Sequence, residues 1–494
     1  MAAGDPEKQP DNKIEELGLN DSHLKREDMI RAVNALADDP NVTIDTFAHL
    51  DVKKILIKLD LHLIPMLTLL YLFSYLDRGN IGNAKIEGLM HDLRLNSSMF
   101  NWCMTSFVLV YSVCEVPSIL LLRRFRPSIY LPGLMVLWGL VLTLSGFAHN
   151  YTGLLITRVC LAIAEAGLYP GMVYLVTVWY CRYEIQVRQA YFFAAASAAG
   201  AFSGLLAYAI SFMAGIGNLS GWRWIFILEG LATILVAFVA HFFIPDNPHT
   251  ASFLTAEERI FIVHRTRQSS SSRFTWPILR ETMTDPQIYL AIIIYWGYIC
   301  PLYGLTLYLP SLIEAMHHSP TTTQLLTIPI YLTACVLTIC LAHLSDKLHL
   351  RSPILALCLT IQLACFIALT HLNLSLKSQY AALFLLTAAV YPCQPAALAW
   401  LANNVPHPAK RALAMGMLIG LGNAGSAFAA RFYTDGEYTR GHRRECVMVA
   451  AGLGALGVQV VRFWVLNRRR ARREGQMWGR TGEGDEGFGW RYTL

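Results

Sequence analysis

Six charged residues lie inside long apolar runs of the sequence: Asp77, Arg78, Glu115, Arg158, Glu165 and Glu229. A charge at the centre of a lipid bilayer costs about 2.5–3.5 kcal/mol on the mildest scale, so each side chain is expected to face other helices and a partner. Arg158 and Glu165 are seven residues apart, which places them on one helix face about 10 Å apart along the axis. An arginine can bind an organic carboxylate, and a buried carboxyl group can take up and release a proton.

Two interpretations apply to these charges. In the structural one, they are ion pairs that lock helices together, and we favour it for Glu115 and Glu229. In the functional one, an arginine pairs alternately with a carboxylate of the protein and with an anionic substrate, which links proton movement to substrate movement. We favour the functional interpretation for the remaining four residues, namely Asp77, Arg78, Arg158 and Glu165.

The composition indicates what kind of protein contains these buried charges. Of 494 residues, 54% are hydrophobic and only 15% are charged, against about 25% charged in a soluble domain. The charges gather in residues 1–60, 244–286 and 467–494, so the rest of the chain cannot cover a water-exposed surface. A soluble enzyme, a nucleic-acid-binding protein and a disordered chain are excluded. The sequence therefore predicts an all-α polytopic membrane protein.

Motifs for cofactors are absent or lie in the wrong context. The eleven cysteines show no metal-ligand spacing. Two G-x-G-x-x-G strings, at Gly420 and Gly452, lie inside apolar helices and not after a strand, so we interpret them as helix-packing positions. We find no nucleotide-binding loop and no catalytic motif, and we predict no enzymatic activity, no cofactor and no metal.

Twelve apolar segments are long enough to span a bilayer. They form two sets of six, one within 59–243 and one within 287–466, and cover 59–82, 99–122, 129–148, 152–178, 190–213, 222–243, 287–310, 321–342, 353–371, 379–402, 412–432 and 446–466. The acidic segment 1–58 is predicted to be a mostly disordered tail, and 467–494 a basic tail. In the central loop 244–286, Thr255 and Glu258 predict a capping box and a short amphipathic helix.

Short-loop arginines and lysines set the expected orientation. The loops on the side of both termini carry nine of them and the opposite loops carry six, so both termini are predicted to be cytoplasmic. Four sequons then fall on the outside, and we regard them as candidate N-glycosylation sites: Asn96, Asn150, Asn218 and Asn373.

Several segments carry a family resemblance. They include YLDRGNIGNAKIEGL (75–89), EVPSILLLRRFRPS (115–128), GWRWIFILEG (221–230), LSDKLHLR (344–351), RVCLAIAEAGLYPGMVYLVTVWYCRYEIQVR (158–188) and LANNVPHPAKRALAMGMLIGLGNAGSAFAARFY (401–433). With them the chain resembles the anion:cation symporter family of the major facilitator superfamily, specifically its fungal allantoate/nicotinate permease group. The resemblance covers residues 55–466 and implies two six-helix halves.

The resemblance also implies roles for single residues. Asp77 and Glu165 match positions for proton coupling, and the positions for substrate binding are Arg78, Arg158 and Asn423. Conformational gating in loops is implied for Arg123, Asp346, Lys347 and Arg351. The general superfamily loop motif is only partly kept, with Ala342 at its first position, and the proline-containing antiporter motif is absent from 197–207.

The expected function is therefore proton-coupled symport of a small organic anion or vitamin-like carboxylate across the plasma membrane, by a monomer in the lipid bilayer without a nucleic-acid partner. Three tyrosines are candidates for the walls of the substrate pocket: Tyr75, Tyr303 and Tyr391. The alternatives are an exporter of a secondary metabolite, a vacuolar carrier and, from another class, a nutrient sensor that has lost transport.

Overall fold

Helices account for all regular structure in the described part of the chain. The computed structural model describes residues 33, 47, 49–181, 184–266, 276–314, 320–371, 374–429, 432, 438–476 and 492–493. No strand occurs among these residues, which confirms the all-α prediction. Most of the predicted tail 1–58 and most of 467–494 lie outside the described residues.

The first half of the chain forms a bundle in which six predicted spans each correspond to one helix or to one broken helix. The helices are α3 (Val52–Ile86), α5 (Ser97–Arg124), α6 (Pro127–Ser145), α7 (Tyr151–Glu165) with α8 (Leu168–Trp179), α9 (Ile185–Ser211) and α10 (Gly221–Phe243). A short helix α4 (Leu89–Asp92) and a 3₁₀ turn η3 (Ile216–Asn218) lie in the connections. Within the bundle α10 packs on α6 and α3, and α3 also packs on α9.

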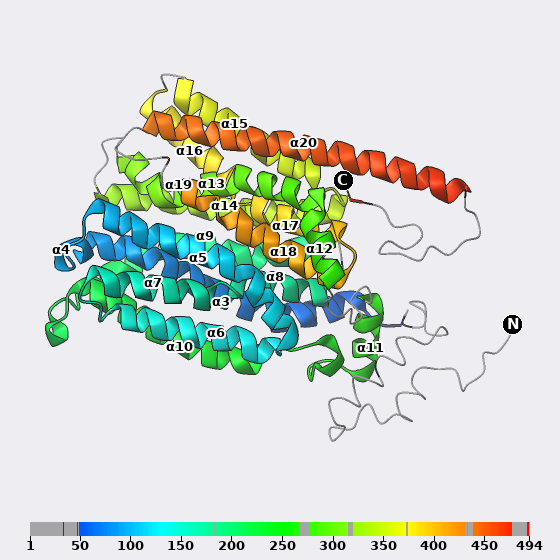
Figure 1. The fold of residues 1–494 in the computed structure, drawn as a ribbon, viewed down its shortest axis with the longest axis horizontal. Helices are drawn as coiled ribbons and strands as arrows, with labels where there is room; N and C mark the ends of the chain where they lie inside the picture. The colour runs from blue at the N-terminus through cyan, green and yellow to red at the C-terminus, as the bar shows by residue number, and fades with distance from the viewer. Residues whose placement is uncertain are drawn as a thin grey trace.

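The second half repeats this arrangement. Its helices are α13 (Pro286–Glu314), α14 (Pro320–Leu348), α15 (Ser352–His371), α16 (Leu376–Val390) with α17 (Cys393–Asn404), α18 (Pro408–Asn423) with α19 (Ser426–Ala429), and α20 (Tyr438–Gln476). All the long helices run side by side (Figure 1). The two halves meet where α9 packs against α14 and where α5 packs against α18.

The connecting segment between the halves lies at one end of the bundle (Figure 1). It contains a 3₁₀ turn η4 (Pro248–Thr250), α11 (Ala256–Arg265) and α12 (Trp276–Thr284). The capping box at α11 is formed, because Thr255 Oγ1 accepts from Glu258 N and the Glu258 carboxylate accepts from Thr255 N. We call this end of the bundle the α11 end and the other one the far end.

Several helices are longer than their predicted spans, most of all α3 and α20. α3 begins at Val52, not at residue 59, because Asp51 accepts hydrogen bonds from Lys53 N and Lys54 N and thereby caps the helix. α20 continues to Gln476, ten residues beyond the predicted end at 466. Its added turns are basic, with Arg468, Arg469, Arg470, Arg472 and Arg473, so the apolar run that predicts a span ends before the helix does.

The fourth span of each half is broken near its middle. α7 ends at Glu165 before α8 begins at Leu168, and α16 ends at Val390 before α17 begins at Cys393. At the first break, a Cβ on Gly167 would lie 1.9 Å from Ser118 Oγ, so only glycine permits this approach of α5. Broken helices at matching positions of two halves are typical of transporter binding sites, because the break places polar groups at mid-membrane depth.

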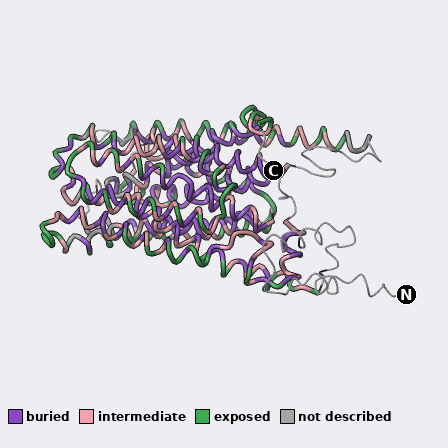
Figure 2. Tube along the Cα trace, turned by 60° about the horizontal axis from the view of Figure 1, so that its bottom comes forward, coloured by how far each residue is buried: buried purple, intermediate pink, exposed green. Residues whose placement is uncertain are grey.

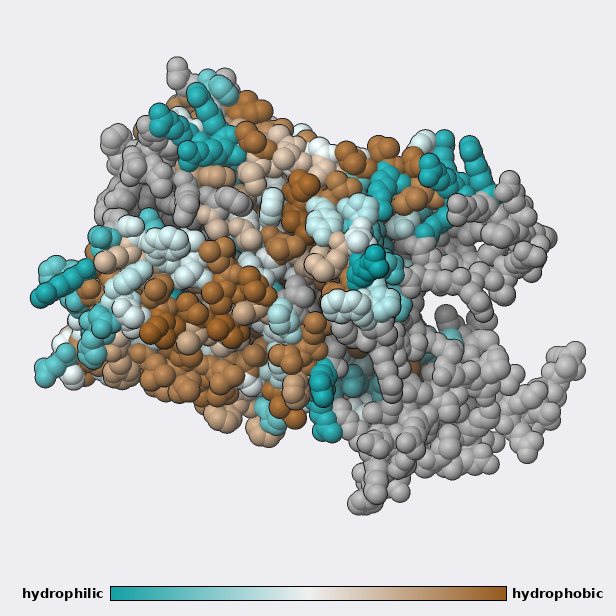
Figure 3. Space-filling view, in the orientation of Figure 1, coloured by the Kyte–Doolittle hydropathy of each residue, from teal (hydrophilic) through white to brown (hydrophobic). Residues whose placement is uncertain are grey.

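The outer surface of the bundle is apolar over its middle (Figure 3). Among the described residues, nine helices are long and apolar enough to cross a membrane. Large side chains on these helices remain exposed, among them Leu235 (66% exposed) and Phe242 (83% exposed). Figure 2 shows buried residues toward the interior of the bundle, and Figure 3 shows hydrophobic side chains over the middle of one face, with hydrophilic ones nearer the ends. This distribution fits a bundle surrounded by lipid.

Candidate functional site

A buried ion pair occupies the middle of the first half. Glu165, the last residue of α7, accepts a hydrogen bond from Arg78 Nε of α3 at 2.7 Å on its Oε1 atom. The same oxygen accepts from Ser74 Oγ, one turn earlier on α3, at 2.6 Å. Glu165 is 1% exposed, so its carboxylate is held by groups of the protein alone. The break after α7 leaves this carboxylate at the level of the arginine.

The arginine of this pair faces the second half of the molecule. Arg78 Nη1 donates to the hydroxyl group of Tyr303 on α13 at 3.4 Å, and its guanidinium lies 4.6 Å from the ring centre of Tyr111 on α5. Beside it, the hydroxyl groups of Tyr75 on α3 and Thr306 on α13 are 3.2 Å apart. The predicted pocket tyrosines Tyr75 and Tyr303 therefore lie at the interface of the two halves, next to the ion pair.

A second polar chain crosses the same interface. Asn423 of α18 donates from Nδ2 to Glu115 Oε1 of α5 at 3.1 Å and accepts on Oδ1 from the Tyr295 hydroxyl at 3.3 Å. Gln394, near the start of α17, donates to the hydroxyl groups of Tyr295 and Tyr169 at 2.9 and 2.8 Å. Residues from both broken helices thus take part in the polar contacts between the halves.

Glu115 and Gln394 were not among the site residues predicted from the sequence. From the sequence, a structural role is favoured for Glu115. Its position becomes clear only from the close packing of α5 and α18, where a Cβ on Gly420 would lie 2.8 Å from the Ser112 carbonyl oxygen. The signal in the sequence that could have revealed it is the small residue Gly420, three positions before Asn423.

Asp77 faces away from the arginine that follows it. Its Oδ2 accepts from Trp138 Nε1 of α6 and from Thr233 Oγ1 of α10, both at 2.9 Å. Its Oδ1 has no hydrogen bond among the described residues. Consecutive helical residues point about 100° apart, so the side chains of Asp77 and Arg78 contact different helices. The structure separates the two carboxylates predicted for proton coupling.

Arg158 lies deeper than a substrate-binding side chain at the interface would. It is 3% exposed, and its guanidinium lies 5.4 Å from the ring centre of Phe226 on α10. Its Nε and Nη2 atoms have no hydrogen bond in the described part of the chain. Arg158 and Glu165 do share a helix, but Glu165 pairs with Arg78. Arg158 acts electrostatically on both Glu165 and Asp77.

The predicted gating residues of the second half lie at the α11 end. Asp346, near the end of α14, accepts from Val187 N of α9 at 3.1 Å and forms an ion pair with the buried Arg351. Arg351 also donates to Gln186 of α9, and Ser345 Oγ donates to the same amide oxygen at 2.7 Å. The start of α9 is thus bound to the end of α14 across the two halves.

The other predicted gating residues and the candidate glycosylation sites are either exposed or outside the described residues. Lys347 is exposed, and the side chain of Arg123 lies outside the described residues. Three candidate sequon asparagines, Asn96, Asn150 and Asn218, are exposed at the far end, whereas Asn373 lies outside the described residues. Asn96 and Asn150 also cap α5 and α7 by accepting from backbone N–H groups.

The glycine strings pack helices at four of their positions, Gly420, Gly422, Gly425 and Gly452, whereas a Cβ on Gly454 or Gly457 would meet nothing within 4 Å. A Cβ on Gly452 of α20 would lie 2.8 Å from the Cα of Gly297 on α13, and one on Gly422 would lie 2.5 Å from the Tyr295 ring. Such close approach requires glycine and leaves no room for a dinucleotide. Among the described residues, no group of three or more histidine, cysteine, aspartate or glutamate side chains could hold a metal ion.

Comparisons with known proteins agree with this architecture. The family model described as Major Facilitator Superfamily matches residues 67–430. The chain is 32% identical over 486 residues to the MFS-type transporter cnsO of Penicillium expansum (93% of this chain, 92% of that protein). It is 28% identical over 464 residues to the high-affinity nicotinic acid transporter of Saccharomyces cerevisiae, covering 92% of this chain and 86% of that one.

A solved structure shows the same fold. The proton:xylose symporter XylE superposes with a TM-score of 0.63 at 13% identity, over 81% of this chain and 95% of that chain. Two bundles of apolar helices with polar residues at their interface are typical of secondary transporters. The chain belongs to the major facilitator superfamily and is a multi-pass membrane transporter of small molecules.

Proposed function

We propose that the protein is a proton-coupled symporter of small organic anions, with Glu165 as a proton-binding group and Arg78 as an anion-binding group. The observation that carries this proposal is the 2.7 Å bond between them beside Tyr303 of the second half. An arginine that is already paired to a carboxylate of the protein can exchange this partner for a substrate carboxylate.

The exchange couples proton and substrate. While Glu165 is ionised, it holds Arg78 through a charge-assisted hydrogen bond. When Glu165 takes up a proton, this attraction is lost, and the Arg78 guanidinium is available to a substrate carboxylate at the interface of the halves. Release of substrate toward the other side allows the proton to leave and the pair to form again. Neither the proton nor the anion then crosses alone.

The other predicted site residues have supporting roles. Asp77 is a second proton-binding carboxylate, set apart from the interface. Arg158 provides positive charge behind Glu165 and Asp77, and Asn423 presents its amide at the interface. The contacts of Asp346 and Arg351 with α9 close the α11 end, so these residues gate access from that side.

The substrate class follows from the arginine and from the resemblance of the chain. A small carboxylate fits an interface that offers one guanidinium surrounded by tyrosine and amide groups. The similarity to the yeast nicotinic acid transporter supports a vitamin-like carboxylate and membership in the anion:cation symporter family. We further propose a monomer in the plasma membrane with the α11 end in the cytoplasm, in line with the basic residues of the loops at that end.

The test uses Glu165→Gln in permease-deficient yeast and in proteoliposomes. The probes are labelled allantoate, nicotinate, pantothenate and biotin. The wild type should accumulate at least one of them when the outside is acidic, and the variant should lose this accumulation while it still exchanges the same probe across the membrane. Glu445→Gln serves as a control, since Glu445 is equally buried (0% exposed) but lies on α20 beside Cys300, away from Arg78.

Two outcomes would contradict the proposal. Undiminished acid-driven accumulation by Glu165→Gln would exclude Glu165 as a coupling group. Export of a probe from cells, without any acid-driven uptake, would favour a metabolite exporter instead.

A further inference from the structure

Glu229 of α10 is a buried carboxylate that the proposed mechanism does not use. It is 5% exposed, and neither of its oxygens has a hydrogen bond among the described residues. An ionised carboxylate in such surroundings lacks the partners that would stabilise its charge. A carboxyl group of this kind in a membrane helix is a candidate functional group when a second ionisable residue lies beside it.

The neighbours of Glu229 connect it to Asp77. Thr233 lies one turn from Glu229 on the same face of α10 and donates to Asp77 Oδ2 at 2.9 Å. Asn80 lies one turn from Asp77 on the same face of α3. The Asn80 side chain faces Glu229 without a hydrogen bond of good geometry. All these side chains are buried, with Asp77, Asn80 and Thr233 at 0% exposed.

These four side chains form a polar column between α3 and α10, with two residues at each of two heights along the helices. Because these helices are antiparallel, Asp77 with Thr233 forms one level, and Asn80 with Glu229 forms the next level toward the far end. Glu229 follows the start of α10 at Gly221 by eight residues, which places it about 12 Å along the helix from the far end. It therefore lies between the far end and Asp77.

The column is closed on the side of α6. A Cβ on Gly230 would lie 2.3 Å from Thr143 Oγ1 and 2.7 Å from the Gly139 carbonyl oxygen, so α6 and α10 touch through their backbones. Trp138 of α6 closes the next level through its bond to Asp77. Neither lipid nor bulk water can reach Asp77 from that side.

Few charged groups face this column. On α3, the charged residue that interacts electrostatically with Glu229 is Asp77. On α6, no acidic or basic residue occurs between 127 and 145. From α7, Arg158 lies against Phe226, one turn from Glu229 toward the far end. On α9, Arg188 is bound to Asp60 at the α11 end. Glu229 thus has Asp77 as its acidic neighbour, whereas Glu165 and Arg158 of α7 both act on Asp77.

We propose that Glu229 is a proton-relay carboxylate that passes protons between the far end of the bundle and Asp77. The relay rests on the proposed proton-coupled function and adds a residue to it. In the transfer step the O–H bond of protonated Glu229 breaks and an O–H bond forms on Asp77 Oδ1, the oxygen that lacks a hydrogen bond among the described residues. The negative charge moves from Asp77 to Glu229, where a proton from the far end neutralises it.

The test compares Glu229→Gln, Glu229→Asp and the control Glu445→Gln in proteoliposomes, with the four labelled carboxylates named above as probes. Glutamine keeps the shape of the side chain but cannot carry the proton, whereas aspartate can. Glu445 is a matched control, since it too is buried with neither oxygen hydrogen-bonded in the described part of the chain. The readouts are acid-driven accumulation at a series of external pH values, substrate-evoked proton uptake, and exchange without a pH gradient.

Glu229→Gln should lower acid-driven accumulation and substrate-evoked proton uptake roughly tenfold, as expected for loss of coupling between sites, and should leave exchange intact. Glu229→Asp should restore part of the accumulation with a shifted pH profile, and Glu445→Gln should behave as the wild type. A structural role would reduce exchange and accumulation together.

Two further results would overturn the relay, and they differ in meaning. If the wild type couples to protons and Glu165→Gln uncouples it, but Glu229→Gln matches the wild type, then only the relay fails. If the wild type itself shows neither acid-driven accumulation nor substrate-evoked proton uptake with any probe, then the proposed function fails and the relay with it.

Discussion

Arg78 and Glu165 are bonded through Nε and Oε1 at 2.7 Å, although 87 residues of chain separate them. The pair is asymmetric, because the Arg78 side chain is 17% exposed and that of Glu165 only 1%. The arginine is therefore the member that a molecule at the interface of the halves can reach. The carboxylate behind it can respond to protons without touching the substrate.

Arg78→Lys tests this division of roles. Lysine keeps the positive charge but loses the planar group that can bond Glu165, Tyr303 and a substrate carboxylate at once. We expect the apparent KM of the best probe to rise roughly tenfold or more, as for loss of a hydrogen bond to a charged group. Concentration-dependent uptake measures this. Arg126→Lys, at an exposed cap of α6, is the control, and an unchanged KM in Arg78→Lys would refute the anion-binding role.

Arg351→Gln tests the closure of the α11 end. Removing one member of a buried ion pair costs about 3–5 kcal/mol, and here it would leave Asp346 and Gln186 without their cation. We expect the contact of α9 with α14 to open more often. A cysteine at the buried position Val187 should then react faster with a maleimide in the Arg351→Gln background, as measured by peptide mass spectrometry.

A second buried arginine provides the control for this labelling. Arg411 lies at the same end, but its hydrogen bonds to the Val405 and Pro406 carbonyl oxygens stay within the second half. Arg411→Gln should leave the labelling of Val187→Cys unchanged. Equal labelling rates in all three backgrounds would show that Arg351 does not hold the halves together.

The membrane helices could largely be predicted from the sequence, since each requires only a long apolar run, but the breaks after Glu165 and Val390 could not. The pairing of Arg78 with Glu165 could not, because it depends on the rotation and depth of α3 relative to α7. The seven-residue spacing of Arg158 and Glu165 correctly places both on one helix. It carries no information on which arginine of a neighbouring helix comes closer, and the break after Glu165 turns that carboxylate toward α3.

Glu115 shows the same difficulty for contacts between the halves. Its bond to Asn423 joins residues 308 positions apart and requires that α5 and α18 touch at Gly420. Hydrophobic periodicity predicts that a helix has a buried side, but not which helix of the other half covers it. Local features such as the Thr255 capping box needed no such information, since all their atoms come from four consecutive residues.

The docking of α11 should depend on pH through Glu258. Its carboxylate accepts from Lys58 Nζ of α3 at 2.7 Å and from Thr255 N at 2.8 Å. Burial raises the pKa of Glu258, but these hydrogen bonds outweigh burial and hold the pKa below its ordinary value. A lowered pKa in the folded state means that the stabilisation is complete above the pKa of the unfolded chain. It is lost as the pH falls through the folded value.

The measurement is the midpoint of thermal unfolding of the wild type and of Glu258→Gln from about pH 7 to about pH 3. The wild type should be the more stable protein at neutral pH, and the difference should vanish at the acidic end. Lys58→Met should show the same trend, and Glu87→Gln, at the opposite end of α3, should show none. A difference that stays constant with pH would mean that the charge of Glu258 does not hold α11.

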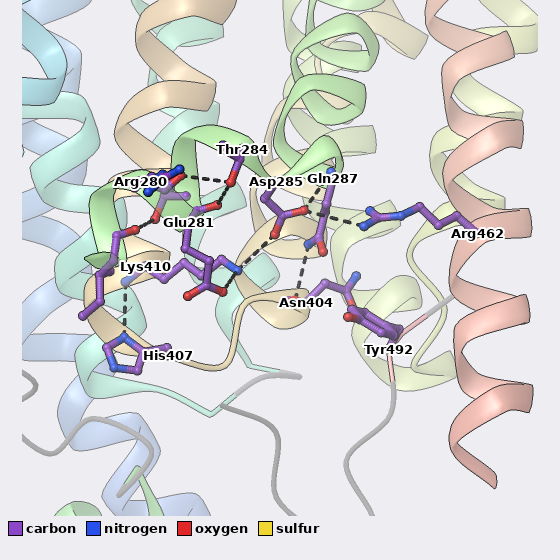
Figure 4. Close-up of polar contacts among 12 residues, drawn as sticks. Arg280, Glu281, Thr284, Asp285, Gln287, Asn404, His407, Lys410, Arg462 and Tyr492 are labelled. Carbon is purple, nitrogen blue, oxygen red and sulfur yellow. Dashed lines mark hydrogen bonds and ion pairs between the residues drawn. The ribbon is translucent and has the colours of Figure 1, made fainter. Parts of the chain in front are cut away.

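The last residues of the chain should stabilise the second half. Asn404, at the end of α17, accepts a hydrogen bond from Thr493 N at 2.8 Å and donates one to the Thr493 carbonyl oxygen at 3.2 Å. Asn467 of α20 accepts from Tyr492 N and donates to the Tyr492 carbonyl oxygen, both at 2.9 Å. The Tyr492 ring stacks on Phe463, with ring centres 4.6 Å apart. Figure 4 shows Tyr492 beside Asn404, close to the ion pairs of Asp285 with Lys410 and Arg462.

Deletion of residues 492–494 should therefore lower the free energy of unfolding by about 2 kcal/mol, from one aromatic stack and several hydrogen bonds. Asn404→Ala should have a similar effect, and the combination should cost less than the sum, because both changes remove the same bonds. Thermal unfolding of the purified protein measures this, with deletion of Leu494 alone as the control. Fully additive effects of the two changes would show that Asn404 and the chain end stabilise the protein independently, contrary to the bonds that join them.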